Sequence, residues 1–298
     1  MKHKFELTGN RQRGEVRNYH GSPSPLFINK SKKGNIAGLK VAIKRNTIIE
    51  ISSDDIESKF TIGMEVEKNI LSSRAVHEYT LLKGFERDGS CGIGDNDGYE
   101  AITHILPLLP ACRWRQDLFN IMYECEKIID DQWSPSNTSC GGHITIGAQG
   151  YNSDELMIAC RQFSGIMMAI FMPRLSNSYC SGNKRMRTED DNVDDNRIYQ
   201  KFNMVHQNTD HTIEFRVVAR FQSVKQMMNR YKVMYELVNT SINHPRRSFN
   251  KFLEQVRPII KSMYDGDADK VEEKFEYALK FNDFLRQGRV HEDIRHIV

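Results

Sequence analysis

The stretch from Thr61 to Glu67 (TIGMEVE) constrains the fold more than any other part of this chain. Apolar residues alternate along it with glycine and glutamate, which is the period-two pattern of a β-strand with one apolar face. Glu65 and Glu67 fall on the polar face, about 6–7 Å apart. At an effective dielectric of about 20, two such charges repel by about 2.5 kcal/mol, and a bound cation would offset that repulsion. The alternative is a solvated edge strand whose two acids bind nothing.

Two later stretches, CGGHITIG at 140–147 and TIEFRVV at 212–218, repeat this layout of polar and apolar faces. If the three strands lie in one antiparallel sheet, its polar face collects carboxylates, an imidazole and a guanidinium. Burying such acids without a metal is costly. Carboxylates with one histidine suit Mg²⁺ or Mn²⁺, and arginine suits a phosphate through bidentate hydrogen bonding. The polar residues of the two later strands are His143, Thr145, Glu214 and Arg216.

Composition sets broad limits on the function. The 298 residues carry a net charge of +3, too small to indicate nucleic-acid binding, although residues 1–60 hold twelve Lys/Arg against six Asp/Glu. No apolar segment follows Met1 and no apolar run is long enough to span a bilayer, so we expect neither a signal peptide nor a membrane partner. The six cysteines form no CxxC motif and indicate reduced thiols. We therefore expect a cytoplasmic protein without a nucleic-acid partner.

Local patterns predict the remaining organisation of the chain. Residues 1–36 are polar and rich in glycine and serine, which predicts coil, and β-branched residues predict a small hairpin within 39–51. Glycine-punctuated residues 87–98 predict a loop, and the polar segment that begins at Arg174, above all 175–196, predicts a mobile lid. Helical spacing is found in four regions: 69–82, ending at Gly84; 113–132; 153–171, capped by Ser153; and 223–298, broken near His244-Pro245 and at Gly266.

Four motifs occur in a fixed order along about residues 60–220. They are Gly63-x-Glu65-x-Glu67, Asp88-Gly-Ser90 with Glu100, Cys140-Gly-x-His143-x-x-x-Gly147, and Thr212-Ile-Glu214-Phe-Arg216. This set resembles the amidoligases, which are carboxylate–amine ligases related to glutamine synthetase and glutamate–cysteine ligase. Arg174 with Tyr179-Cys180, and Tyr199 with Asn203, are similar to the family's linking segment. In one departure, Thr145 stands where the family's Gly-x-His-x-His pattern has its second histidine.

The resemblance implies an α+β fold, with a glutamine synthetase-like concave antiparallel sheet (a half-barrel) backed by helices. The composition and this resemblance together divide the chain into two regions. Residues 1–59 are a basic, partly flexible N-terminal extension with room for short strands. Residues 60–298 are an amidoligase-like catalytic domain with a helical C-terminal part.

The resemblance also implies an activity, which is ATP-dependent formation of an amide or isopeptide bond through an acyl phosphate. The cofactors implied are ATP and Mg²⁺, with Mn²⁺ as an alternative metal. The substrates implied are a carboxylate and an amine, each a small molecule, a peptide or a protein terminus. The implied metal ligands are Glu65, Glu67, Glu100, His143 and Glu214; the catalytic residues are Glu65, Asp88 and Arg216; and the ATP-binding residues are Arg174, Asn203 and Arg216, the last on the γ-phosphate.

Two other function classes stay open. A metal-dependent phosphohydrolase or nuclease also uses clustered carboxylates, and a non-catalytic adaptor would use the basic N-terminus. At the residue level, His143 has an alternative role as a hydrogen-bonded structural histidine. Cys140 and His143 point to different faces, which argues against a Cys–His nucleophile.

Overall fold

The computed structural model describes residues 2–6, 16–18, 27–28, 48–52, 60–70, 82–94, 96–103, 106–107, 129, 135–148, 150–177, 205–209 and 212–286. The chain forms two compact units. The first comprises residues 1–142 with 220–224, and the second 143–219 with 225–298. Strands and helices both contribute, so the fold class is α+β as predicted.

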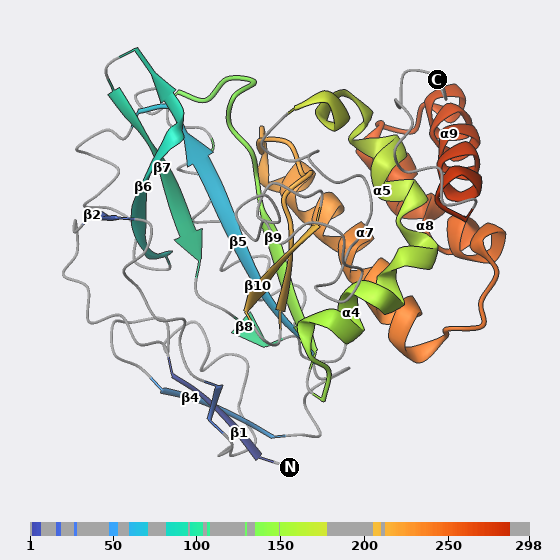
Figure 1. Ribbon diagram of the computed structural model, residues 1–298, viewed down its shortest axis with the longest axis horizontal. Helices are drawn as coiled ribbons and strands as arrows, with labels where there is room; N and C mark the ends of the chain where they lie inside the picture. The colour runs from blue at the N-terminus through green and yellow to red at the C-terminus, as the bar shows by residue number, and fades with distance from the viewer. Residues whose placement is uncertain are drawn as a thin grey trace, which may run out of the picture. The chain divides into compact units, whose positions relative to one another are not determined.

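Four strands of the first unit lie side by side in the order β2-β6-β7-β5, and a short strand, β8, pairs with β5. β5, β7 and β6 pair antiparallel, whereas β2 pairs with β6 in parallel. Figure 1 shows β5, β7 and β6 in blue to teal. The bounds are β2 Val16–Asn18, β5 Phe60–Lys68, β6 Leu82–Ile93, β7 Asn96–Thr103 and β8 Leu106–Pro107.

β5 is the strand that the TIGMEVE alternation predicts. Its apolar side chains are at most 2% exposed. The polar face is also largely covered, because Glu67 is only 5% exposed. The strand is therefore buried more deeply than a half-exposed strand, and Glu67 lies away from bulk water, whereas Glu65 is partly exposed. The apolar residues are Phe60, Ile62, Met64 and Val66.

The predicted loop at 87–98 is wrong, because these residues belong to the β6–β7 hairpin. The strands turn at Gly94, whose φ of 60° is left-handed. The register shifts between Asp88 and Ile93, so the glycine-rich residues form a bulge instead of ending the strand.

The helix predicted for 69–82 is also wrong at both ends. Leu82 and Gly84 lie in β6, Asn69 and Ile70 form a bend, and residues 71–81 lie outside the described part.

A separate three-stranded sheet lies near the N-terminus, with strand order β3-β1-β4. β1 pairs antiparallel with both neighbours. The prediction of coil for residues 1–36 is therefore wrong where β1, β2 and β3 form. β4, the end of the predicted hairpin, pairs with β1, and residues 39–47 lie outside the described part. The bounds are β1 Lys2–Glu6, β3 Phe27–Ile28 and β4 Ile48–Ser52.

In the second unit, β11 pairs antiparallel with β9 on one side and with β10 on the other. The alternating patterns at 140–147 and 212–218 therefore predict two strands correctly. Their apolar residues Ile144, Ile146 and Ile213 are fully buried. The bounds are β9 Ile144–Ala148, β10 Val205–Thr209 and β11 Thr212–Phe215.

The helix predicted for 153–171 is interrupted. Its N-cap is Asn152 and not Ser153. The Asn152 side chain accepts a hydrogen bond from the Glu155 amide, and the Glu155 side chain accepts one from the Asn152 amide, which makes a capping box. The chain then forms α4 (Ser153–Cys160), a 3₁₀ turn η2 (Arg161–Phe163), α5 (Gly165–Ile170) and a second 3₁₀ turn η3 (Met172–Ser176). Arg174 lies in η3 and so does not begin the predicted loop.

Three helices complete the second unit and confirm the predicted breaks. They are α7 (Val224–Asn243), α8 (Phe249–Met263) and α9 (Ala268–Arg286). α5 packs against α9, as Figure 1 shows. A Cβ at Gly165 would lie 2.6 Å from the Ala278 carbonyl oxygen, so glycine permits this close approach.

Several predictions fall outside the described residues. These are the helix at 113–132, apart from the helical and buried Ile129, and most of the predicted lid, with Tyr179, Cys180, Tyr199 and Asn203. The boundary at 59/60 stays a prediction. Among the described helices, none combines the length and apolarity that a membrane span requires.

Candidate metal-binding site

The register of the first unit's sheet pairs Glu100 on β7 with Glu67 on β5 and with Glu86 on β6. Glu67 and Glu100 are directly opposed residues of antiparallel strands, so they point to the same face, with Cα atoms about 4.5–5.5 Å apart. Like charges in such positions repel. The sequence motif included two members of this row, Glu67 and Glu100, whereas Glu86 emerges only from the strand register.

Glu100 is buried even more completely than Glu67. Its side chain is 0% exposed, and neither carboxyl oxygen makes a hydrogen bond with another described residue. Burial, followed by the negative charges of Glu65, Glu67 and Asp88, raises the pKa of Glu100 well above its usual range. A carboxyl group in this position favours either a proton or a cation beside it.

Glu67 receives a backbone hydrogen bond from the glycine pair of the CGGH motif. The amide of Gly141 donates to Glu67 Oε2. Both residues are buried. Gly141 therefore fixes one oxygen of Glu67.

Asp88 lies at the start of the bulge in β6. Its two oxygens accept from the Ser90 amide and the Ser90 hydroxyl, each at 2.8 Å. Glu67, Asp88 and Cys91 each offer one ligand atom, and these three atoms lie within 4.8 Å of one another. Such a group has a suitable size for a metal ion. The Asp-Gly-Ser motif thus positions Asp88 beside Glu67, as the predicted site requires.

A buried amide holds the bulge against the segment that leads to the glycine pair. Asn69, which is 0% exposed, donates through Nδ2 to the Cys91 carbonyl oxygen at 2.5 Å. The same nitrogen lies 3.2 Å from Asn137 Oδ1 and 3.1 Å from Ser139 Oγ. Asn69 therefore joins the backbone around Cys91 to the backbone around Cys140.

The two cysteines of these segments, Cys91 and Cys140, are free and at most 1% exposed. Their thiols share a hydrogen bond. This bond, then burial and the negative charge of Glu67, raises the pKa of Cys91, whereas the same bond lowers the pKa of Cys140. Cys91 is therefore the member that keeps its proton.

The second unit brings His143, Glu214 and Arg216 together. Arg216 Nη1 lies 2.7 Å from Glu214 Oε1, and His143 Nδ1 lies 3.3 Å from the same oxygen. All three side chains are buried. A carboxylate at Nδ1 orients a histidine so that its Nε2 is available to a metal. The structural and the metal-binding roles of His143 are therefore compatible.

The strand register pairs Glu214 with two further positions, Thr145 on β9 and His206 on β10. Thr145, at the position of the family's second histidine, is 8% exposed. His206 belongs to none of the four sequence motifs. Only the pairing of β10 with β11 places it opposite Glu214.

The described residues therefore bring predicted site residues together in two groups. The first unit gathers Glu65, Glu67, Asp88 and Glu100, and the second unit gathers His143, Glu214 and Arg216. Arg174, a predicted ATP-binding residue, lies in η3, and its charge acts on Arg230. Burial, together with the charge of Arg174, lowers the pKa of Arg230 to about 10, against the opposing effect of Tyr264.

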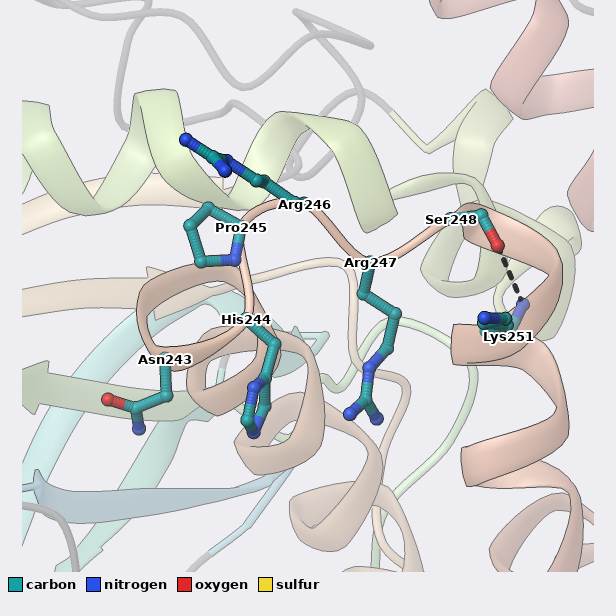
Figure 2. A pocket seen from close by; sticks show the side chains of 7 residues that line it. All are labelled: Asn243, His244, Pro245, Arg246, Arg247, Ser248 and Lys251. Carbon is teal, nitrogen blue, oxygen red and sulfur yellow. Dashed lines mark hydrogen bonds between the residues drawn. The ribbon is translucent and has the colours of Figure 1, made fainter.

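Among the described residues, the helical part of the second unit lines two cavities, and neither contains a predicted site residue. The larger, about 780 Å³, surrounds the turn between α7 and α8 (Figure 2). Figure 2 shows His244 and Arg247 extending to one side of this turn and Arg246 to the other. The smaller, about 430 Å³, lies beside α8 and α9. The larger is lined by Asn243, His244, Pro245, Arg246, Arg247, Ser248 and Lys251.

No protein-family model matches this sequence, and a search of curated proteins finds no significant match.

Proposed function

We propose that this protein is an ATP-dependent carboxylate–amine ligase whose buried acids bind Mg²⁺. The observation that carries the metal site is Glu100, a fully buried carboxyl group without a hydrogen-bond partner among the described residues. It lies opposite Glu67 in the sheet. A divalent cation would relieve both the repulsion and the missing partner. The four sequence motifs support the choice of ligase chemistry.

The donor set suits a hard cation. Oxygen donors from Glu65, Glu67 and Glu100 match the preference of Mg²⁺, which Mn²⁺ shares. When bound, the metal would screen the ATP phosphates and stabilise the charge that develops during transfer. Gly141 orients Glu67 through its amide, and Arg216 orients Glu214.

The proposed reaction has two steps. A carboxylate oxygen of the substrate attacks the γ-phosphorus of ATP, the bond to the β-phosphate oxygen breaks, and ADP leaves. The amine then attacks the acyl carbon, loses a proton, and releases phosphate with the former carboxylate oxygen. Arg216 is the residue proposed to bind the transferring phosphoryl group, since a guanidinium donates two parallel hydrogen bonds to phosphate oxygens.

Metal-dependent ATP turnover tests the site. We expect Glu65→Ala, Glu67→Ala and Glu214→Ala to abolish release of ADP in assays with pools of amino acids and peptides as substrates. Glu276→Ala, which removes an exposed acid from α9, is the control and should keep full turnover. Circular dichroism would establish that each variant remains folded. Full turnover in a folded variant of any of the three site acids would remove the proposed site.

Isotope transfer distinguishes the ligase from a phosphohydrolase with the same metals. In the ligase, a substrate labelled with ¹⁸O in its carboxylate gives phosphate that carries one labelled oxygen. A phosphohydrolase takes that oxygen from water and gives labelled phosphate only in ¹⁸O-water. Amide product with unlabelled phosphate would contradict the acyl-phosphate route.

A further inference from the structure

We propose that the smaller cavity of the second unit, about 430 Å³, is a binding site for a free amino acid with an apolar side chain. Its walls come from the start of α8 and the last turns of α9, two helices that pack together (Figure 1). This volume falls within the range of small-molecule sites. The described lining contains no residue of the proposed metal site, so binding here is separate from the ligase chemistry.

The first observation is a buried side-chain amide in the cavity wall. Asn282 lines the cavity and is only 7% exposed, and its Oδ1 atom accepts no hydrogen bond from another described residue. Buried polar atoms normally have such a partner. Packing also restricts this side chain, because a Cβ at Gly165 of α5 would lie 3.1 Å from the Asn282 Cβ. A ligand that donates an N–H group would supply the partner.

The start of α8 supplies backbone donors to the same cavity. The Ser248 side chain accepts a hydrogen bond from the Lys251 amide, and the Ser248 carbonyl oxygen accepts one from the Phe252 amide. The amides of Phe249 and Asn250 come before these and have no acceptor within the helix. Both residues line the cavity. A ligand carboxylate would accept from these amides and be stabilised by the helix dipole.

The α9 wall carries charges of both signs. Asp283 and Arg286 line the cavity and are exposed. They are three residues apart on one helix, yet within the described part of the chain neither forms an ion pair. An acid and a base beside one cavity complement a zwitterion. The ligand ammonium would lie at Asp283 and at the Asn282 oxygen, and the carboxylate at Arg286 and the start of α8.

The apolar part of the wall determines the ligand side chain. It consists of Phe249 and Leu279, of which Leu279 is 43% exposed. Phe249 belongs to an aromatic cluster, with its ring centroid 6.5 Å from that of Phe163 and 6.3 Å from that of Phe252. An apolar side chain placed against these residues would remove their surface from water. The chemistry of the cavity therefore combines an acceptor for an ammonium, donors for a carboxylate and an apolar wall.

Isothermal titration calorimetry with L-leucine, L-methionine and L-phenylalanine tests the proposal on the full-length protein. The buffer contains EDTA and no ATP, so neither metal binding nor ATP turnover contributes heat. We expect at least one of the three to bind at one molecule per chain. For the amino acid that binds best, the analogue without the ammonium group and the analogue without the carboxylate should each bind at least ~5-fold more weakly, because each loses one charged partner.

Two exposed variants assign the charged groups of the ligand to residues. Arg286→Gln should weaken the amino acid about 5-fold and leave the affinity of the amine analogue, which has no carboxylate, unchanged. Asp283→Asn should weaken the amino acid by a similar factor and leave the carboxylic acid analogue unchanged. Glu276→Gln is the matched control, because Glu276 is an exposed acid of α9 that does not line the cavity. It should bind like the wild type.

Asn282→Leu removes the buried oxygen while keeping a similar volume. We expect the affinity to decrease about 10-fold without a decrease in the Tm of the ligand-free protein, because the oxygen has no partner there to lose. If this variant fails to fold, the Asp283 and Arg286 variants decide. Binding of none of the three amino acids, analogues that bind as tightly as the amino acid, or wild-type affinity in every folded cavity variant would overturn the proposal.

Discussion

At the residue scale, Glu100 couples the stability of the metal-free protein to pH. Its pKa is raised by burial and by neighbouring acids, so the folded protein keeps a proton that the unfolded chain, with a carboxyl pKa of about 4.3, releases. The free energy of unfolding is therefore highest below that value. It decreases as pH rises towards the folded pKa, by up to ~1.4 kcal/mol per pH unit.

We expect Glu100→Gln to reduce this pH dependence, because the amide carries no titrating proton. Urea unfolding in EDTA between about pH 5 and 8 would measure it. The variant should lose less stability than the wild type as pH rises. Glu276→Gln, an exposed change, should leave the slope unaltered. Equal slopes for the wild type and Glu100→Gln would show that Glu100 is ionised in both states.

Arg216 offers a test of the phosphate role at the same scale. Arg216→Lys keeps the positive charge near Glu214 but loses the planar fork that binds two phosphate oxygens. We expect kcat for ATP turnover to decrease about 100-fold with a smaller change in KM. Arg246→Lys, which alters an exposed arginine at the α7–α8 turn (Figure 2), should have no effect. An unchanged kcat in Arg216→Lys would exclude contact with the transferring phosphoryl group.

At the scale of elements, the β6–β7 hairpin holds Asp88 and Cys91 beside β7. Gly98→Ala introduces a Cβ 2.7 Å from the Cys91 carbonyl carbon, and backbone cannot move away as a flexible side chain would. We expect a loss of about 1–3 kcal/mol in the free energy of unfolding, measured by urea titration. Gly89→Ala in the same bulge is the control, because nothing lies within 4 Å of its Cβ. Equal stability of the two variants would contradict the described packing of the hairpin.

The elements also show what the sequence could predict. Strands with strict alternation, such as β5 and β11, were predictable because the pattern is local. The β6–β7 hairpin was not, since its glycines and acids resemble a loop unless the partner strand is known. The break between α4 and α5 was equally hidden, because Gly165 packs against the carbonyl of Ala278, more than a hundred residues later.

The same distinction applies to the candidate site. Spacing alone placed Glu65 with Glu67 and Glu214 with Arg216, because residues two apart share a face of a strand. Glu86 and His206 were missed, since their positions depend on register between strands that are distant in sequence. Asn69 carries no motif at all. Its role is visible only from the hydrogen bonds that it makes to Cys91 and Ser139.

At the scale of the whole molecule, the N-terminal segment decides between an enzyme and an adaptor. Residues 1–60 hold twelve basic and six acidic residues. If the working part of the protein were this basic segment, removing residues 1–59 would abolish binding to an acidic polymer such as heparin and leave no other activity. We expect instead that residues 60–298 retain metal-dependent ATP turnover.

Two truncations test the boundary at 59/60, and strand pairing predicts how they differ. β1 pairs with β3 and β4, so a chain that starts at Phe60 loses this small sheet as one piece. A chain that starts at residue 37 keeps β4 without β1 and exposes an unpaired strand edge, which promotes aggregation. Both truncations also remove β2, which pairs with β6 of the larger sheet at three positions. Within the described part of residues 1–59, β2 is the strand that joins this sheet. We therefore expect the shorter chain, 60–298, to be the more soluble and to stay monodisperse in size-exclusion chromatography. Aggregation of 60–298 with a well-behaved 37–298 would place the boundary before β4 and make that strand part of the catalytic domain.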